Sequence, residues 1–194
     1  PLVQAGLLPA DYPLVINAVS GYSGGGKSLI ARMEDPEVSD PIGSAFFLYG
    51  LGLEHKHVPE IQAHGFLEQR PLFTPSVGRF HQGMIVEVPL QLWAVPGNPS
   101  VEVIRETLAS YYDGRYFVRL ADAAETEARA GSLDPEELND TNHLRLFVFG
   151  NQDRGQVLLA AQLDNLGKGA SGQAVQNMNL MLGLDERVGI DGRA

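Results

Sequence analysis

Five runs of apolar, strand-forming residues constrain the fold of this chain more than any other feature. Two of them are joined by the short polar turn NQDRG, whose glycine is typical of a β-hairpin, while helical segments separate the others. Hairpin and crossover connections together predict an α+β domain, built on a mixed, largely antiparallel β-sheet with helices packed on one face. The runs cover residues 14–19, 45–51, 84–95, 143–150 and 156–164.

Helix signals lie between these strands. We expect helices over residues 99–112 and 170–182, the second ended by Gly183, a short helix before Pro36 and another that begins at Val58. Residues 2–8 have the pattern of the last turns of a helix, so we expect the chain to begin within an element. Pro89 places its strand near a sheet edge or a bulge.

Composition excludes several classes of function. The chain has 194 residues, enough for one domain with a hydrophobic core, and 24 acidic against 14 basic residues, which disfavours nucleic acid and anionic membranes. No apolar stretch approaches the roughly 20 residues that span a bilayer. No export signal begins the chain, so we expect a cytoplasmic location. The absence of cysteine excludes disulfides, thiolate metal sites and a thiol nucleophile within these residues.

A glycine-rich segment, GYSGGGKS at residues 21–28, matches the pattern of a phosphate-binding loop between a strand and a helix. Glycines let backbone amides approach an anion closely, and Lys27 would attract it. Two other interpretations stay open. A P-loop nucleotide-binding protein would use the same residues, although no second strand ends in a convincing magnesium-binding aspartate. Alternatively, the glycines form a turn without any ligand.

Titratable residues cluster where the second strand meets a helix. His55, Lys56 and His57 stand just before Pro59 and Glu60. A histidine transfers protons near neutral pH and a neighbouring carboxylate can orient it, so these residues are candidates for acid/base chemistry. The other histidines form no recognisable ligand set with them, and no metal site is predicted.

Two further segments have both a functional and a purely structural interpretation. Arg79 lies in a glycine-bounded loop and could hold a carboxylate or phosphate with its planar fork, although such an arginine is more often solvated. Residues 164–172, DNLGKGASG, place glycines and a lysine at a helix start. Close helix packing would explain these small residues without a ligand.

Four blocks of sequence, residues 19–27, 55–61, 73–75 and 167–180, occur in this order along nearly the whole chain. Together they closely resemble N-acetyl-gamma-glutamyl-phosphate reductases, particularly the shorter subtype. These enzymes are similar to aspartate-semialdehyde and glyceraldehyde-phosphate dehydrogenases. The resemblance implies a Rossmann domain that binds NADP(H) and a second, catalytic and dimerisation domain with the fold predicted above. It also implies reduction of N-acetyl-gamma-glutamyl phosphate to N-acetylglutamate semialdehyde, in arginine biosynthesis, through a cysteine thioester.

This chain has neither a cysteine nor a dinucleotide-binding fingerprint. We therefore expect a truncated portion of such an oxidoreductase that is inactive alone and binds no NADP(H) tightly. By the resemblance, residues 1–166 would form the substrate-binding and dimerisation domain, and residues 167–194 a helix and tail that return to the NADP-binding domain. The partners would be a small-molecule substrate and further copies of the chain, in a dimer or tetramer that covers the apolar strand at residues 84–95.

Residue roles follow from the resemblance alone. His55 would be the acid/base group, with Glu60 as its orienting partner and His57 as the rival candidate. The substrate-binding residues would be Ser20, Gly21, Tyr22, Ser23, Gly24, Lys27 and, more weakly, Arg79. The residues beside the cofactor would be Asn165, Gly167, Lys168, Gly169, Gly172 and Asn177.

Overall fold

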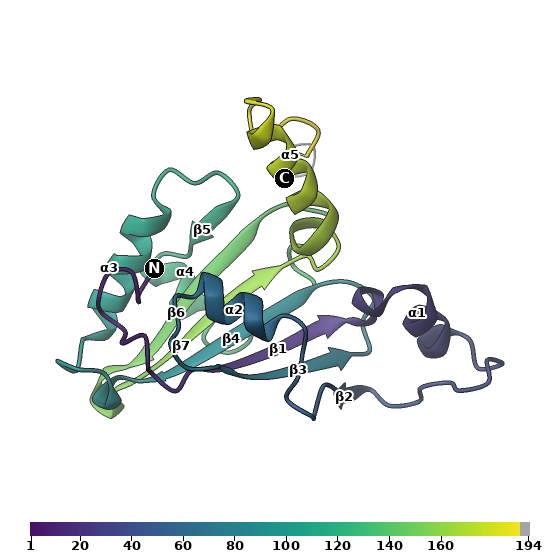
Figure 1. Cartoon of the computed structure of the whole chain (residues 1–194), viewed down its shortest axis with the longest axis horizontal. Coiled ribbons are helices and arrows are strands. Elements are labelled where there is room, and N and C mark those ends of the chain that lie inside the picture. The colour runs from purple at the N-terminus through teal and green to yellow at the C-terminus, as the bar shows by residue number, and fades with distance from the viewer. Residues whose placement is uncertain (191–194) are drawn as a thin grey trace.

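The computed structural model describes residues 1–190, and its centre is a seven-stranded sheet with the strand order β2-β3-β1-β4-β7-β6-β5 (Figure 1). The β1–β3 and β5–β6 pairs are parallel, whereas the other four neighbouring pairs are antiparallel. The prediction of a mixed, largely antiparallel sheet is confirmed. The strands are β1 (Val15–Gly21), β2 (Phe46–Leu48), β3 (Leu72–Gly78), β4 (Met84–Gln91), β5 (Val118–Leu120), β6 (Leu144–Asn151) and β7 (Gln156–Leu163).

Helices lie on one face of this sheet and beyond one of its ends. Figure 1 shows α2 in front of the strands, α3 at the left beside β6, α1 beyond the end of β1, and α5 projecting past the end of β7. None of the helices within residues 1–190 is long and apolar enough to cross a membrane. The α-helices are α1 (Gly26–Glu34), α2 (Val58–His64), α3 (Val101–Tyr112), α4 (Ala123–Ala128) and α5 (Gly172–Met181).

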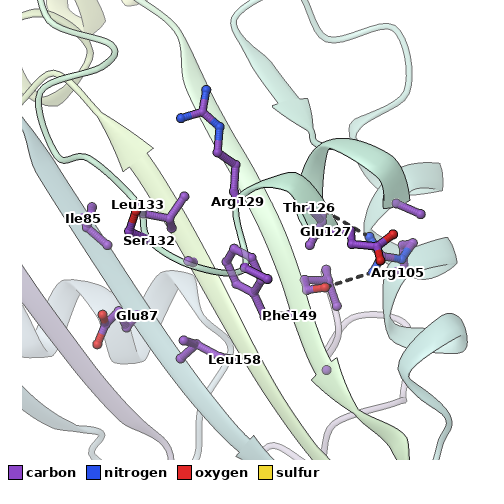
Figure 2. Close-up of a pocket in the computed structure, with 15 residues that line it drawn as sticks. Ile85, Glu87, Arg105, Thr126, Glu127, Arg129, Ser132, Leu133, Phe149 and Leu158 are labelled. Carbon is purple, nitrogen blue, oxygen red and sulfur yellow. Dashed lines mark hydrogen bonds between the residues drawn. The ribbon is translucent and has the colours of Figure 1, made fainter.

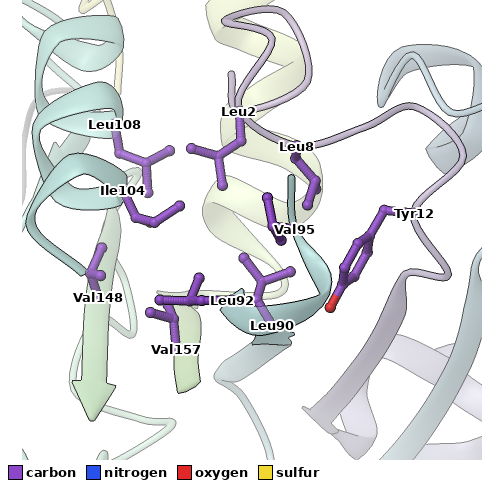
Figure 3. Packing of buried hydrophobic residues seen from close by; sticks show 10 residues of the cluster. All are labelled: Leu2, Leu8, Tyr12, Leu90, Leu92, Val95, Ile104, Leu108, Val148 and Val157. Carbon is purple, nitrogen blue, oxygen red and sulfur yellow. The ribbon is translucent and has the colours of Figure 1, made fainter. Parts of the chain in front are cut away.

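The main hydrophobic core forms where α3 packs on the sheet (Figure 3). Ser100 caps the start of this helix by accepting a hydrogen bond from the Val103 N–H at 3.2 Å. Ile104 and Leu108 face the strands because residues four apart lie on the same side of a helix. They are buried in one cluster with residues from β4, the 3-10 segment after it, β6, β7 and the N-terminal segment: Leu2, Leu8, Tyr12, Leu90, Leu92, Val95, Val148 and Val157.

The opposite face of the sheet is only partly covered. Phe147 and Ala160 alternate with the core residues of β6 and β7, so their side chains lie on this second face, where they are buried with Ala121. After β5, the polypeptide passes around the edge of the sheet and reaches this second face through α4 (Figure 2). The predicted one-sided helix layer therefore applies to α2 and α3, whereas residues 121–133 cover one end of the other face.

Arg105 lies at this edge of the sheet. Its Nη2 donates to the Val148 carbonyl at 2.9 Å, beyond the last residue at which β5 pairs with β6. Its Nη1 lies 3.4 Å from Thr126 Oγ1 of α4, and Figure 2 shows both contacts. One side chain from α3 thus satisfies a backbone acceptor that no strand covers.

Several local predictions are confirmed. The β6–β7 hairpin turns through a short 3-10 helix (Gln152–Arg154) and Gly155. Helix α3 ends at the predicted residue, and Gly183 follows the last turn of α5 with a φ of 69°. The prediction that Pro89 places its strand near a sheet edge or a bulge is wrong, because β4 lies in the middle of the sheet between β1 and β7. Pro89 itself pairs with β7 only, since β1 pairs with β4 no further than Glu87. The missing N–H of this proline therefore interrupts no second ladder.

Other local predictions are wrong. Residues 2–8 form no helix. The Gly6 N–H nevertheless donates to the Val3 carbonyl and the Leu7 N–H to the Leu2 carbonyl, both at 2.9 Å, which is the hydrogen-bond pattern found at the C-terminus of a helix. The predicted strand over residues 84–95 stops at Gln91 and continues as a 3-10 helix, and that over residues 45–51 is reduced to β2. β3, β5 and α4 were not predicted. Pro75 lies inside β3, where proline normally argues against a strand.

Burial predicts how much the core contributes to stability. We expect Ile104→Ala, at a residue only 1% exposed, to lower the free energy of unfolding by about 2–5 kcal/mol, because the deleted atoms leave a cavity. The neighbouring Val103→Ala, at a residue 39% exposed, should change it by less than about 0.5 kcal/mol. Urea unfolding followed by circular dichroism at one protein concentration measures both. Equal losses in the two variants would contradict the placement of α3.

Candidate functional site

The glycine loop, residues 20–27, begins with the last two residues of β1 and lies tightly against the segment before β4. Gly21 permits this contact, since a Cβ atom there would lie 2.5 Å from the His81 carbonyl oxygen. The next two backbone amides bind the same segment: the Tyr22 N–H donates to Phe80 and the Ser23 N–H to His81, both at 3.0 Å. The loop then forms a 3-10 helix (Tyr22–Gly25).

The end of β7 meets the glycine loop through Asn165. This side chain is 8% exposed, and its Nδ2 donates to Ser23 Oγ at 3.1 Å. Its Oδ1 accepts the Gly83 N–H at 2.7 Å. A predicted substrate-binding residue and a predicted cofactor-adjacent residue, 142 positions apart in sequence, are therefore in direct contact.

Asp164 directly precedes Asn165, and these two residues form the corner after β7. Asp164 was not among the predicted site residues. It is 1% exposed, and its carboxylate accepts hydrogen bonds from Gln82 Nε2 at 2.6 Å, the Asp140 N–H at 2.8 Å and the Leu166 N–H at 2.7 Å. A carboxylate directly after a buried strand and before a glycine-rich segment was the available signal.

A π-helical turn (Gly167–Ser171) connects this corner to α5. Gly172 lies so close to the preceding loop that a Cβ atom would be 2.2 Å from Asn142 Oδ1. The interpretation of these glycines as residues for close packing therefore has structural support. Single π-helical turns are rare and often occur at functional sites.

A cavity of about 480 Å³ lies beside this turn. Its wall includes Gln82 and Asp164 from the corner, Gly167 and Gly172 from the turn, and Asn142. The Asn142 side chain is 4% exposed, and within residues 1–190 its Oδ1 has no hydrogen-bond partner. A buried acceptor without a partner is costly in a folded protein, which makes this cavity the best candidate for a ligand contact.

Lys168 and Asn177 have partners within the fold. Lys168 is 7% exposed, its Nζ donates to Gln176 Oε1 at 2.6 Å, and it lies 5.7 Å from the centre of the Phe117 ring. Burial lowers the pKa of Lys168, while the charge of Glu186 acts in the opposite direction. Asn177 is exposed and accepts from Gln173 Nε2 at 2.9 Å.

His55 belongs to a separate aromatic cluster. Its ring centre lies 5.1 Å from Phe73, 5.6 Å from Tyr49 and 4.9 Å from His57. The His57 N–H donates to His55 Nδ1 at 3.2 Å, so the neutral ring carries its proton on Nε2. Burial, followed by the charges of His57 and Lys56, lowers the pKa of His55, which favours the neutral ring at pH 7.

Glu60 lies on the exposed surface of α2, and within residues 1–190 no hydrogen bond or ion pair joins it to His55. His55 lies beside the middle of β1. Phe73, which touches His55, pairs with Ile16, and a Cβ atom at Gly50 would contact both His55 and Pro75, which pairs with Ala18. Within residues 1–190, hydrogen bonds join the glycine loop to the C-terminal corner, whereas none joins His55 to either segment.

The remaining predicted substrate-binding residues serve the local fold. The Arg79 guanidinium donates to the carbonyls of Met33 at 2.9 Å and Ser44 at 3.1 Å, and also to that of Ile42, which fastens the long connection between α1 and β2. Tyr22 donates its hydroxyl to Glu34 Oε1 at 2.8 Å, and this bond raises the pKa of Tyr22. Lys27 is exposed in the first turn of α1.

No group of three or more His, Asp or Glu side chains within residues 1–190 could hold a metal ion. A second cavity, of about 570 Å³, lies on the face of the sheet opposite α2 (Figure 2). It contains none of the predicted site residues. Its wall is formed mainly by the strands, α4 and the segment after α4, and includes Ile85, Glu87, Arg129, Leu133, Phe149 and Leu158.

Comparison with known proteins defines the class. Residues 1–165 match the family model described as "Semialdehyde dehydrogenase, dimerisation domain", and the chain belongs to this family. Among solved structures, an aspartate semialdehyde dehydrogenase from Francisella tularensis has a TM-score of 0.66 at 10% identity, covering 93% of this chain and 60% of that one. The aspartate semialdehyde dehydrogenase II of Vibrio cholerae has a TM-score of 0.56 at 17% identity, covering 87% and 54%.

Relatives with higher sequence identity indicate which kind of semialdehyde dehydrogenase this chain resembles. The chain is 58% identical over 183 residues to the N-acetyl-gamma-glutamyl-phosphate reductases of Brucella ovis and Brucella canis, covering 94% of this chain. It spans 59% of the length of these relatives. The resemblance inferred from the four sequence blocks is confirmed, whereas the P-loop interpretation gains no support.

The His55 cluster predicts a measurable coupling between two histidines. Because the charge of His57 lowers the pKa of His55, His57→Gln should raise that pKa, and NMR titration of the imidazole protons would measure the change. The backbone bond from residue 57 to His55 Nδ1 remains in this variant. His64→Gln, at the other end of α2, is the matched control and should leave the His55 titration unchanged. An unchanged His55 pKa in His57→Gln would contradict the arrangement of the two rings.

Proposed function

We propose that this chain is the substrate-binding and dimerisation part of an NADP-dependent N-acetyl-gamma-glutamyl-phosphate reductase. The observation that carries the proposal is the 58% identity to enzymes of that name over 94% of the chain. The contact between the glycine loop and the C-terminal turn supports it, since it joins two segments that the resemblance assigns to substrate and cofactor. A role in arginine biosynthesis and a cytoplasmic location are parts of the same proposal.

One part of the structure fits contact with a cofactor. Gly167, Gly172 and Asn142 line the cavity beside the π-helical turn, and within residues 1–190 no hydrogen bond satisfies the buried Asn142 Oδ1. NADPH would supply the hydride, and no dinucleotide fingerprint lies in these residues. Asn165 and Lys168 would act through the position of the turn, because their polar atoms already have partners.

The chain's own residues would contribute substrate binding and proton transfer. The glycine loop from Ser20 to Lys27 would hold the acyl phosphate, with Lys27 providing the positive charge. His55 would move the proton at its Nε2 atom, since Nδ1 is already occupied by the His57 N–H. The required thiol is absent from this chain, which contains no cysteine, so we expect no turnover from these residues alone. The division at residue 166 between this domain and a tail that returns to the cofactor domain remains part of the proposal.

Assays of the longer reductase containing these residues would test the function. We expect His55→Ala to lower kcat about 10²–10⁴-fold with little change in KM, as for the loss of an acid/base group. His57→Ala should cost less. Because Glu60 makes no contact with His55 in this structure, Glu60→Gln should have an intermediate effect only if the two side chains approach each other in the assembled enzyme.

The absence of acyl-phosphate reduction by the longer protein would refute the proposed function. A larger loss in His57→Ala than in His55→Ala would instead reverse the assignment between the two histidines while leaving the family unchanged.

We also propose that two copies associate through the sheet face opposite α2 and α3. Leu158 and Phe149 lie on this face beside Glu87 (Figure 2). We expect Leu158→Glu to dissociate the dimer, because it buries a charge next to the Glu87 carboxylate. Light scattering over a concentration series measures the mass. Val103→Glu, on the outer surface of α3, is the control and should stay dimeric. A monomeric unmodified chain at high concentration would contradict the proposed interface.

A further inference from the structure

Asn165 is the point where three segments of the chain meet. It lies in the corner after β7, binds Ser23 of the glycine loop, and binds the Gly83 N–H at the start of β4. We propose that Asn165 is a positioning residue that locks the glycine loop to the turn leading into α5. The inference rests on the proposed function for its catalytic meaning, but the lock itself is a property of this chain.

Burial makes these hydrogen bonds hard to replace. Asn165 is 8% exposed and Ser23 is 5% exposed, so water has little access to either side chain. The carboxamide uses its acceptor for Gly83 and its donor for Ser23, and an apolar side chain of the same size could do neither. Losing one partner would leave a buried polar group unsatisfied, which costs more than the net value of the bond.

The corner that carries Asn165 is itself fixed. Asp164 accepts hydrogen bonds from the side chain of Gln82 and from two backbone N–H groups, of Asp140 and Leu166. On the loop side, a Cβ atom at Gly24 would lie 3.3 Å from Asn165 Nδ2, which shows how closely the loop approaches. A shift of the C-terminal turn therefore has to move the glycine loop or break the Ser23 bond.

The lock would couple two binding regions. The glycine loop is the proposed substrate site, and the turn from Gly167 is the proposed cofactor contact. With Asn165 between them, a ligand that orders the turn also orders the loop, and the separation of substrate and cofactor stays fixed.

Hydrogen exchange on this chain tests the lock directly. The amides to follow are those of Tyr22 and Ser23, whose hydrogen bonds to the 80–81 segment anchor the loop. Ser23→Ala should speed their exchange about 2- to 12-fold, the range expected for one net hydrogen bond. Asn165→Leu, which removes two bonds, should speed it about tenfold or more. The double variant should match Asn165→Leu, because the second change then has no partner left to remove.

The matched control is Asn151→Leu. Asn151 also accepts one backbone N–H, from Arg154 at 3.1 Å, but it lies at the opposite end of the β6–β7 hairpin. This variant should leave exchange at Tyr22 and Ser23 unchanged. Unchanged exchange in Asn165→Leu, or additive effects in the double variant, would overturn the lock.

Cofactor binding to the longer reductase tests the coupling. Addition of NADP⁺ should slow exchange at Tyr22 and Ser23 in the unmodified protein, and this protection should be lost in Asn165→Leu. A residue that only stabilised the fold would leave the protection intact, and equal protection in both proteins would overturn the coupling. If the longer protein binds no NADP⁺, the proposed function fails, whereas the exchange result on this chain still decides the lock.

Discussion

The register of the central β4–β7 pair determines where the candidate site segments lie. Met84 pairs with Leu163, so the start of β4 and the end of β7 are adjacent. The same end of the sheet receives Ser20, which pairs with Met84, and Leu144, which pairs with Leu163. The glycine loop, the turn before β4, the loop before β6 and the corner after β7 must therefore meet there, since each is continuous with a paired strand. A one-residue slip in this register would turn every side chain to the other face and separate these contacts.

Local sequence signals predicted the elements that local physics determines. The apolar spacing of α3, the glycine after α5 and the polar turn of the β6–β7 hairpin each depend on neighbours within a few residues. β3 was missed because Pro75 argues against a strand. The Pro75 carbonyl accepts the Tyr49 N–H, just beyond the end of β2. Since β2 has ended there, no strand on this side of β3 needs the N–H that proline lacks. β5 and α4 are short, and tertiary packing rather than periodicity defines them.

The candidate site could be predicted as a set of segments but not as a geometry. Sequence blocks identified the glycine loop, the histidines and the C-terminal turn, yet no pattern within the sequence relates Ser23 to Asn165. Their contact follows from strand order, which depends on long-range pairing. The same pairing gathers buried polar groups at this end of the sheet, among them the side chains of Asn139, Asn142 and Gln162, whose oxygens have no hydrogen-bond partner within residues 1–190.

The two outer strands have a consequence for assembly. β2 and β5 are each only three residues long, and beyond β5 the Arg105 guanidinium occupies the Val148 carbonyl. Within residues 1–190, neither edge strand presents a long row of unpaired backbone groups with which a strand of another molecule could pair. Copies of this chain therefore have little opportunity to extend one another's sheets into an open filament. In the proposed dimer, contact between copies would be made by side chains on the faces, where a two-fold arrangement closes on itself and growth stops at a finite particle.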